Sequence, residues 1–186
     1  MELDRLLESC RSGDELAWEQ LVRQYQGRVV GLAYHYVENR EEACDVAQEA
    51  FIRIYRNILL CRDERMFLPW VIRITRNLSI DHLRRKAARP PTMDVPVEEV
   101  RDLPAEWGDP HQELTLNSRK RLIFRALRDL TELNREIILL KEIQGLTLEE
   151  IASLLKVPLG TVKSRANRAR LELAERVLAM SAVGPS

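Results

Sequence analysis

The stretch LTLEEIASLLKVPLGTVKSRANRARLEL, residues 146–173, carries the signals for two helices joined by a tight turn. Thr147 followed by Glu150 is a capping box, which marks the start of the first helix. Apolar residues then recur at helical spacing, at Leu148, Ile151, Ala152 and Leu155. Residues 156–157 form the predicted turn. Pro158 is expected to open the second helix, because its fixed φ suits a first helical position.

The predicted second helix has two faces of opposite character. One face is apolar and small enough for the two helices to cross closely, with Val162, Ala166, Ala169 and Leu173. The other face carries Ser164, Asn167, Arg168 and Leu171, flanked by Lys163, Arg165 and Arg170. A donor-rich second helix of a helix-turn-helix fits the major groove of DNA, where side chains contact base edges and Lys and Arg hold phosphates. A solvated basic face on an ordinary helical hairpin is the alternative.

The distribution of charge divides the chain into blocks. The 186 residues carry 29 basic and 29 acidic side chains. Basic and acidic residues number 5 and 11 in residues 1–50, 10 and 3 in 51–92, 1 and 7 in 93–117, and 13 and 8 in 118–186. Two basic blocks separated by an acidic one favour two modules that face nucleic acid and acidic segments that face something else, such as protein.

The sequence shows no secretory or membrane feature. It has no signal peptide and no run of about 18 apolar residues. Cys10, Cys44 and Cys61 form no CxxC pair. We therefore expect a cytoplasmic protein without membrane insertion, whose thiols are reduced and buried or partly buried. A zinc or redox role for the cysteines is the alternative.

The remaining periodic segments are also helical, so the predicted fold class is all-α. Helices are expected at residues 2–11, 14–37, 41–59, 66–89, 118–130 and 131–144, with Asp14 as a cap, a loop at 59–67 and Gly145 at the end of the last. Residues 90–117 hold five of the eight prolines and seven acidic residues. We expect two small helical domains at 1–92 and 118–180, an acidic linker at 93–117 and a tail at 181–186.

The predicted helix at 41–59 has an unusual exposed stripe. Its buried face consists of Ala43, Val46, Ala47, Ala50, Ile54 and Ile58. Its exposed face consists of Asp45, Gln48, Glu49, Ile52, Arg53 and Arg56. A stripe that mixes carboxylates, an amide and an unburied Ile fits a contact surface for a protein partner. An ordinary solvated face with one stray Ile fits the same pattern.

The predicted helix at 66–89 combines arginines with aromatic residues. Trp70, Val71, Ile74 and Leu78 are expected to point inward, and Arg73, Arg76, Asn77, Asp81, Arg84 and Arg85 outward. An arginine stripe beside Phe67 and Trp70 fits binding of single-stranded nucleic acid, through phosphate neutralisation and stacking. Aromatic residues that belong to the core are the alternative.

Three blocks of the sequence, in this order, resemble the RNA polymerase sigma factors of the extracytoplasmic-function group. They are DVAQEAFIRIYRN (45–57), FLPWVIRITRNLSIDHLRR (67–85) and GLTLEEIASLLKVPLGTVKSRANRARLEL (145–173). Helix-turn-helix modules alone are common, but three blocks with the right linker are specific. The resemblance covers most of residues 1–178.

The resemblance implies three binding surfaces, with no cofactor, metal or small-molecule substrate. The surface for core RNA polymerase would contain Asp45, Gln48, Glu49, Ile52 and Arg53. The surface that melts and reads the promoter minus-10 element would contain Cys61, Arg62, Phe67, Arg73, Arg76, Asn77, Arg84 and Arg85. The surface that reads the minus-35 element would contain Thr161, Lys163, Ser164, Arg165, Asn167 and Arg168. An anti-sigma protein is the implied regulator, and the linker would thread through positively charged channels of the polymerase.

The sequence departs from the family pattern at a few positions. Cys61 stands where many members have an aromatic residue, and residues 63–65 replace a small-polar run. Asn167 occupies a position that is often bulky. A stand-alone helix-turn-helix transcriptional regulator is the alternative function, and residues 121–178 also resemble the DNA-binding domain of LuxR-type regulators. An enzyme is disfavoured, because the three histidines lie far apart in sequence and no nucleophile motif or glycine-rich phosphate loop is present.

Overall fold

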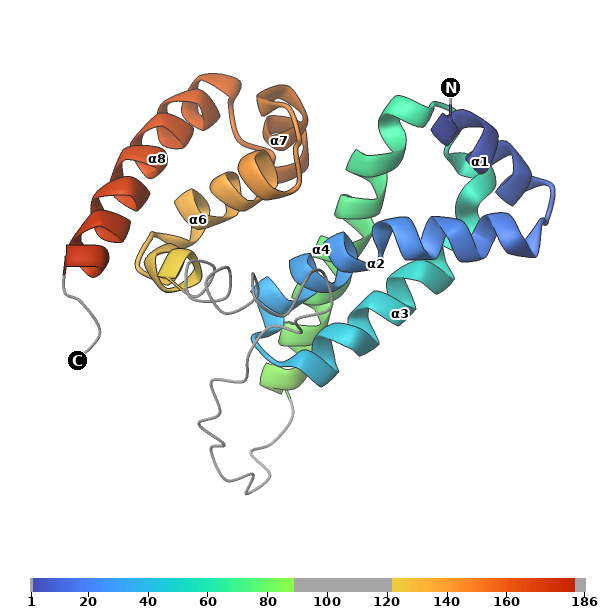
Figure 1. The fold of residues 1–186 in the computed structure, drawn as a ribbon, viewed down its shortest axis with the longest axis horizontal. Helices are drawn as coiled ribbons and strands as arrows, with labels where there is room; N and C mark the ends of the chain where they lie inside the picture. The colour runs from blue at the N-terminus through green and yellow to red at the C-terminus, as the bar shows by residue number, and fades with distance from the viewer. Residues whose placement is uncertain (1, 89–121, 183–186) are drawn as a thin grey trace. The chain divides into compact units, whose positions relative to one another are not determined.

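The computed structural model describes residues 2–88 and 122–182 (Figure 1), and the secondary structure within those ranges is entirely helical. The predicted all-α fold class is thereby confirmed. The chain divides into two compact units, residues 1–99 and 100–186. The predicted linker at 93–117 lies outside the described residues. No helix in the described part of the chain is both long and apolar enough to span a membrane.

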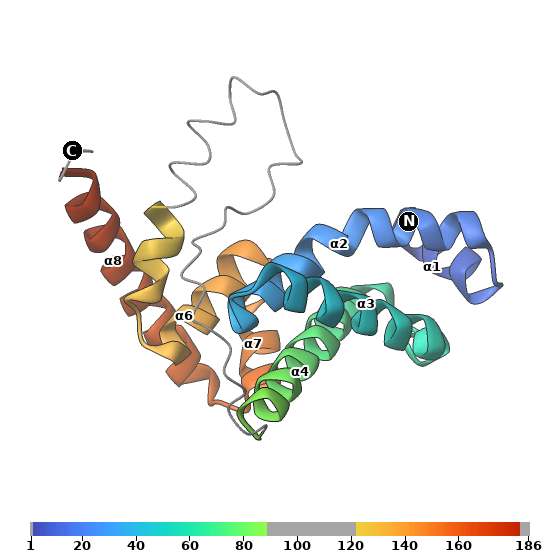
Figure 2. The same cartoon turned by 90° about the horizontal axis from the view of Figure 1, so that it is seen from below.

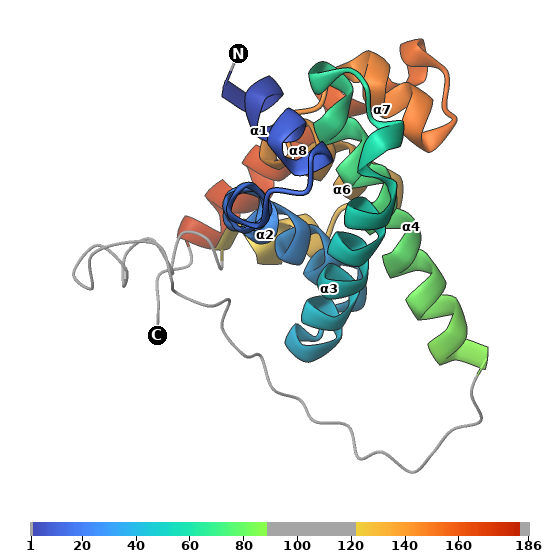
Figure 3. The ribbon, with the colours of Figure 1, turned by 90° about the vertical axis from the view of Figure 1, so that its right-hand side faces the viewer.

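The first unit is a bundle of three long helices with a short helix packed on one side. Its elements are α1 (Glu2–Arg11), α2 (Glu15–Val37), α3 (Arg40–Asn57), the 3₁₀ turns η1 (Ile58–Leu60) and η2 (Glu64–Met66), and α4 (Phe67–Ala88). Helices α2, α3 and α4 pack against one another, and α1 contacts α2 and both 3₁₀ turns (Figures 2 and 3). The predicted helices at 2–11 and 14–37 are confirmed within one residue. The helix predicted at 41–59 ends earlier, and the chain tightens at Ile58 into η1.

Capping side chains fix the starts of α2 and α3. Asp14 accepts hydrogen bonds from the backbone N–H groups of Leu16 (2.9 Å) and Ala17 (3.2 Å), as its predicted capping role requires. Gly13 before it has φ +88°, a left-handed conformation that permits the sharp turn after α1. Asn39 accepts from the N–H of Glu42 at 3.1 Å and starts α3. These short-range signals set the two turns of the bundle.

The core of the first unit forms where the apolar stripes of the four helices meet. All six residues predicted for the inner face of α3, from Ala43 to Ile58, are buried. Phe67 at the start of α4 is fully buried and meets Tyr25 of α2 edge-on, with ring centroids 5.1 Å apart. Trp18 of α2 contacts the ring of Tyr55 of α3, with centroids 4.8 Å apart. Aromatic pairs therefore link α2 to both of its long neighbours.

The inward face of α4 differs from the prediction. Val71 and Leu78 are buried as expected, whereas Trp70 and Ile74 are only partly buried. Buried Thr75 and Ser79 belong to the inner face instead, together with Ile72. The Thr75 hydroxyl donates to the carbonyl of Val71 and the Ser79 hydroxyl to that of Thr75, both at 2.9 Å. These bonds within the helix satisfy the hydroxyl groups, so an apolar-only pattern misses two inward positions.

The second unit contains the helix-turn-helix. After helical residues at 122–128 come α6 (Glu132–Ile138), a π-helical segment η3 (Leu139–Ile143), α7 (Leu148–Leu155) and α8 (Leu159–Ala182). Helix α8 packs against α6 and α7. Its buried contacts include Ala169, which joins Leu127, Leu130, Ile138 and Leu139 in one cluster. Because α8 extends to Ala182, the first two residues of the predicted tail are helical.

The turns of the second unit largely follow the sequence signals. Gly145 has φ +79° and ends the π-helical segment, and Leu146 N–H donates back to the Leu140 carbonyl at 3.0 Å. The capping box predicted for Thr147 and Glu150 is present, with bonds of 2.7 and 3.2 Å. Pro158 lies one residue before α8 rather than inside it. Its carbonyl accepts the first bond of the helix, from Val162 N–H at 3.0 Å.

Candidate nucleic-acid interfaces

Helix α8 presents a polar outer face, as its spacing predicts. Val162 and Ala169 are fully buried and Ala166 nearly so. Lys163, Ser164, Asn167 and Arg168 are exposed, whereas Thr161 is partly buried. The Ser164 hydroxyl donates to the carbonyl of Thr161 at 3.0 Å. The exposed side chains of Lys163, Asn167 and Arg168 form what we call the α8 face, a surface with the donors that base edges and phosphates accept.

Two arginines beside the α8 face are held by the protein itself. Arg165 is partly buried, and its Nη1 donates to Oδ1 of buried Asn134 in α6 at 3.2 Å. Arg170 forms an ion pair with Glu142 at 2.6 Å. Arg165 was predicted to bind DNA, but in this structure its guanidinium fastens α8 to α6. Spacing along α8 does not reveal this, because Asn134 lies 31 residues earlier.

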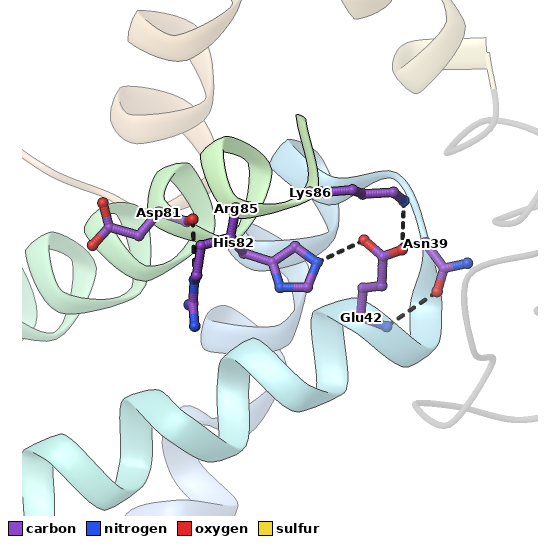
Figure 4. Close-up of polar contacts among 6 residues, drawn as sticks. All are labelled: Asn39, Glu42, Asp81, His82, Arg85 and Lys86. Carbon is purple, nitrogen blue, oxygen red and sulfur yellow. Dashed lines mark hydrogen bonds and ion pairs between the residues drawn. The ribbon is translucent and has the colours of Figure 1, made fainter. Parts of the chain in front are cut away.

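Helix α4 carries the second basic surface. Arg73, Asn77, Arg84 and Arg85 are exposed, and Arg76 is partly buried. Asp81 partly balances the end of this stripe, since its carboxylate lies 3.7 Å from Nη1 of Arg84. Nε of Arg85 donates to the Asp81 backbone carbonyl at 3.3 Å (Figure 4). Arg73 lies about three turns from the adjacent pair Arg84 and Arg85, so one helix offers positive charge to separate phosphates of one strand.

A partly buried cluster of ion pairs joins the end of α4 to the start of α3. Glu42 of α3 contacts Nε2 of His82 at 2.8 Å and Nζ of Lys86 at 2.5 Å (Figure 4). Partial burial acts to raise the pKa of Glu42, but the hydrogen bonds from Lys86 and His82 outweigh it and leave that pKa below its usual value. His82 is partly buried. The cluster fixes the direction in which the basic end of α4 leaves the bundle.

The loop between α3 and α4, residues 58–66, alternates buried and exposed side chains without a period. Leu59, Leu60 and Met66 are 68, 74 and 51% exposed. Arg62 is also exposed. Asp63 accepts hydrogen bonds from the Arg65 guanidinium at 3.0 and 3.1 Å, and these bonds lower the pKa of the Asp63 carboxyl. We call residues 58–66 the α3–α4 loop.

Two residues predicted to touch minus-10 DNA are buried. Cys61 is 6% exposed and Phe67 is not exposed at all. Burial raises the pKa of the Cys61 thiol, as it raises that of Cys10 to about 11. In this structure the side chains of Cys61 and Phe67 are therefore not exposed for the predicted contact with DNA. Both side chains pack into the core, Cys61 from within the α3–α4 loop and Phe67 from the first residue of α4.

The outer face of α3 borders an apolar groove. Asp45 and Gln48 are exposed, Ile52 is 38% exposed, and Glu49 forms an ion pair with Arg53 at 3.0 Å. Beside them a groove of about 840 Å³ runs between α2 and α3. Its apolar lining includes Trp18, Val22, Val30, Phe51, Ile52 and Tyr55. An exposed apolar groove with a polar rim is typical of a protein-binding surface.

The sequence prediction missed most of this groove. Gln48, Ile52 and Arg56 were identified as exposed, but the aromatic lining was not, although Phe51 and Tyr55 lie four residues apart and so share a helical face. Cys44 also lines the groove and is exposed, which corrects the expectation that all three thiols are at least partly buried. Among the residues that the structure describes, no three His, Cys, Asp or Glu side chains gather as metal ligands do.

Comparisons with known proteins identify the family. The family model Sigma-70 region 2 matches residues 21–89, and Sigma-70, region 4 matches residues 120–173. An ECF RNA polymerase sigma-E factor of Haemophilus influenzae is 36% identical over 170 residues, which cover 89% of each chain. RNA polymerase sigma-H factor of Pseudomonas aeruginosa is 34% identical over 171 residues, also covering 89% of each chain.

Two solved structures share the fold. CnrH in complex with the cytosolic domain of CnrY has a TM-score of 0.63 at 24% identity, covering 95% of this chain and 97% of that chain. The sigma factor RpoE of Bartonella quintana, in complex with the anti-sigma factor NepR, has a TM-score of 0.63 at 22% identity. The match covers 86% of this chain and 95% of that chain. The sequence relatives span nearly the whole chain at more than 30% identity. The chain therefore belongs to the extracytoplasmic-function group of RNA polymerase sigma factors, the initiation factors that direct promoter-specific transcription.

Proposed function

We propose that this sigma factor divides its work among three surfaces. The α8 face reads the minus-35 element, α4 with the α3–α4 loop opens and reads the minus-10 element, and the outer face of α3 binds core RNA polymerase. The observation that carries the proposal is the presence of two separate donor-rich surfaces, one in each compact unit. A promoter with two spaced elements needs two such surfaces on one chain.

At the minus-35 element, Asn167 and Arg168 are the residues that we assign to base contacts. Their exposed amide and guanidinium groups can form the bidentate bonds that distinguish adenine and guanine in the major groove. Lys163 is assigned to a phosphate. Arg165 supports α8 from behind through Asn134, so its effect on DNA binding is indirect.

At the minus-10 element, α4 supplies phosphate contacts and the α3–α4 loop supplies base contacts. Arg73, Arg84 and Arg85 are exposed for the first role, and Asn77 lies one turn from Arg73. We assign base contact to exposed Arg62 and Met66 of the loop and no longer to buried Cys61 and Phe67. Extrusion of a base costs a few kcal/mol, which contacts in such a loop must offset.

The surface for core polymerase combines the polar stripe of α3 with the adjoining groove. Asp45 and Gln48 give orientation, and Ile52 with Tyr55 gives apolar area at its centre. Polar groups around an apolar centre are the usual arrangement at a specific protein interface. We further propose that an anti-sigma protein competes for this surface, since the two fold relatives above were solved with a protein partner bound.

The proposed role is non-enzymatic and cytoplasmic, and the acidic segment at 93–117 is proposed to lie in basic channels of the polymerase. Reconstitution tests the whole proposal. Core polymerase alone and with the protein would be given a library of genomic fragments, and transcript start sites mapped by sequencing. We expect new start sites that share two spaced elements. Transcripts identical to those of core alone would contradict the proposal.

A further inference from the structure

We propose that Arg11, the last residue of α1, is a positioning residue for the reading of the minus-10 element. The inference rests on the proposed function of the α3–α4 loop. Arg11 touches no DNA in this proposal. It holds the backbone of the loop in the conformation that presents Arg62 and Met66, and the family model that matches residues 21–89 does not include it.

The contact joins two points that lie 50 residues apart in sequence. Nη2 of Arg11 donates a hydrogen bond to the backbone carbonyl of Cys61 at 2.5 Å. Cys61 is the residue at which the chain leaves η1. Its N–H donates to the Ile58 carbonyl at 3.2 Å, and its own carbonyl accepts from Arg11. A bond from a charged donor is about twice as strong as a neutral one. Arg11 therefore fixes the corner of the loop that precedes Arg62.

The end of α1, which carries Arg11, is held firmly by the rest of the bundle. The α1 residues Leu7 and Cys10 are 0 and 2% exposed, so the helix is anchored in the core. Nε1 of Trp18 donates to the carbonyl of Cys10 at 3.1 Å, immediately before Arg11. Because Trp18 belongs to α2, the end of α1 is tied to the body of the bundle. Because the backbone at Arg11 is held by the bundle, its side chain can fix the position of the loop instead of moving with it.

The end of the loop next to α4, residues 63–66, is held by hydrogen bonds within the loop itself. Asp63 accepts from Arg65 N–H at 2.9 Å, and its carbonyl accepts from Met66 N–H at 3.0 Å. Arg62 lies between this local turn and the corner held by Arg11. Of the hydrogen bonds described for the two ends of the loop, only that of Arg11 comes from outside it. Loss of Arg11 leaves the buried Cys61 side chain in the core but frees the backbone carbonyl next to Arg62.

Preorganisation gives this contact a functional consequence. A loop that must be ordered during binding spends part of its interaction energy on that ordering, and its base contacts lose geometric precision. Base discrimination should therefore fall when Arg11 is removed, while phosphate contacts made by α4 remain. Contacts of the α8 face with the minus-35 element belong to the other compact unit and provide an internal reference.

Thiol reactivity reports the state of the loop directly. In Arg11→Ala we expect iodoacetamide to modify Cys61 at least about fivefold faster and Cys10 no faster, as read by mass spectrometry, because the Arg11 charge lowers the pKa of both thiols. Arg11 lowers the pKa of Cys61 through its charge, so its removal alone would slow the reaction. Faster modification therefore means opening of the loop. Equal acceleration at Cys10 would mean general unfolding and would overturn the proposal.

The decisive experiment uses holoenzyme, formed from core polymerase and full-length protein. A DNA pool randomised at both promoter elements is selected and sequenced with wild type, Arg11→Ala, Arg11→Lys and Arg5→Ala, an exposed arginine on the same helix. We expect Arg11→Ala to lose about fivefold or more of the discrimination at the minus-10 base and none at minus-35. Arg11→Lys should recover part of it, and Arg5→Ala should match wild type.

Three other outcomes would count against the proposal. Minus-10 discrimination within twofold of wild type in Arg11→Ala overturns the positioning role alone. Parallel loss at both elements makes Arg11 a general stability residue and overturns it as well. Absence of minus-10 selection by the wild-type holoenzyme overturns the proposed function of the loop, and the positioning role with it.

Discussion

The α8 face and the α3–α4 loop are both proposed to contact promoter bases, but their geometry has different origins. On α8, exposure follows the helical period, so buried Val162 is followed by exposed Lys163 and then, three residues later, by buried Ala166. In the loop, Leu60 is 74% exposed and the next residue, Cys61, only 6%. A helical reading surface is set by local spacing, whereas a loop surface is set by contacts with distant helices.

The largest effect that separates the two surfaces is expected at Phe67. Phe67→Ala should lower the free energy of unfolding by about 3–5 kcal/mol, because a fully buried ring leaves a cavity beside Tyr25. Urea unfolding measures the change. Met66→Ala, one residue away and half exposed, should change stability by less than about 1 kcal/mol. An unfolding free energy for Phe67→Ala equal to that of wild type would contradict the burial of Phe67 in the core.

A smaller effect, confined to DNA binding, is expected on the α8 face. Asn167→Ala should cost about 1–3 kcal/mol of discrimination at one minus-35 base and leave the unfolding free energy nearly unchanged. Competitive binding of single-base promoter variants measures it. Arg165→Ala is the matched contrast, because it leaves buried Asn134 without its partner and should lower stability. Equal loss of affinity for every base in Asn167→Ala would exclude a base contact.

The phosphate contacts of α4 should change salt dependence rather than sequence preference. Arg85→Ala should reduce the slope of log affinity against log salt by about 0.7–0.9, for one lost phosphate contact on single- or double-stranded DNA. Titrations of promoter DNA with holoenzyme at several salt concentrations provide the slope. Arg5→Ala, an exposed arginine on α1, serves as control. An unchanged slope in Arg85→Ala would remove this residue from the interface.

The smallest effect is expected from the ion cluster at the end of α4. The pKa of Glu42 is lower in the folded protein than in the unfolded chain, so its contribution to stability is present above the unfolded pKa and lost as pH falls through the folded one. Glu42→Gln should therefore lower stability by about 0.5–1 kcal/mol at pH 7, and the difference should shrink below about pH 4.5. Thermal unfolding at both pH values checks this. A difference that grows in acid would contradict the assigned ion pairs.

The sequence allowed most of the helices, and the buried and exposed faces of α3 and α8, to be predicted, since each depends on spacing within one segment. The six inner residues of α3, the capping box of α7 and the buried face of α8 are of this kind. The roles of Arg11, Arg165 and Phe67 could not be derived in this way. Their partners Cys61, Asn134 and Tyr25 lie 50, 31 and 42 residues away along the chain.

The groove beside α3 shows a third kind of limit. Trp18 and Tyr55 meet only because α2 and α3 pack side by side, and the exposed apolar surface between them belongs to neither helix alone. A single helix period revealed Ile52 as a stray apolar residue. In the packed helices α2 and α3, Ile52 lies beside other apolar residues and forms part of the groove surface.

The most direct test is a titration of core RNA polymerase with protein that carries a fluorophore on its N-terminal amine, because exposed Cys44 lines the groove and excludes labelling through thiols. Wild type is compared with a triple alanine variant at Asp45, Gln48 and Glu49. A second triple variant, at exposed Asp4, Glu8 and Gln20, removes the same side-chain types from α1 and α2. The account predicts tight binding by wild type and the second variant, and a loss of about 100-fold or more in the first. Equal affinity for all three proteins, or no binding by folded wild type, would contradict the account.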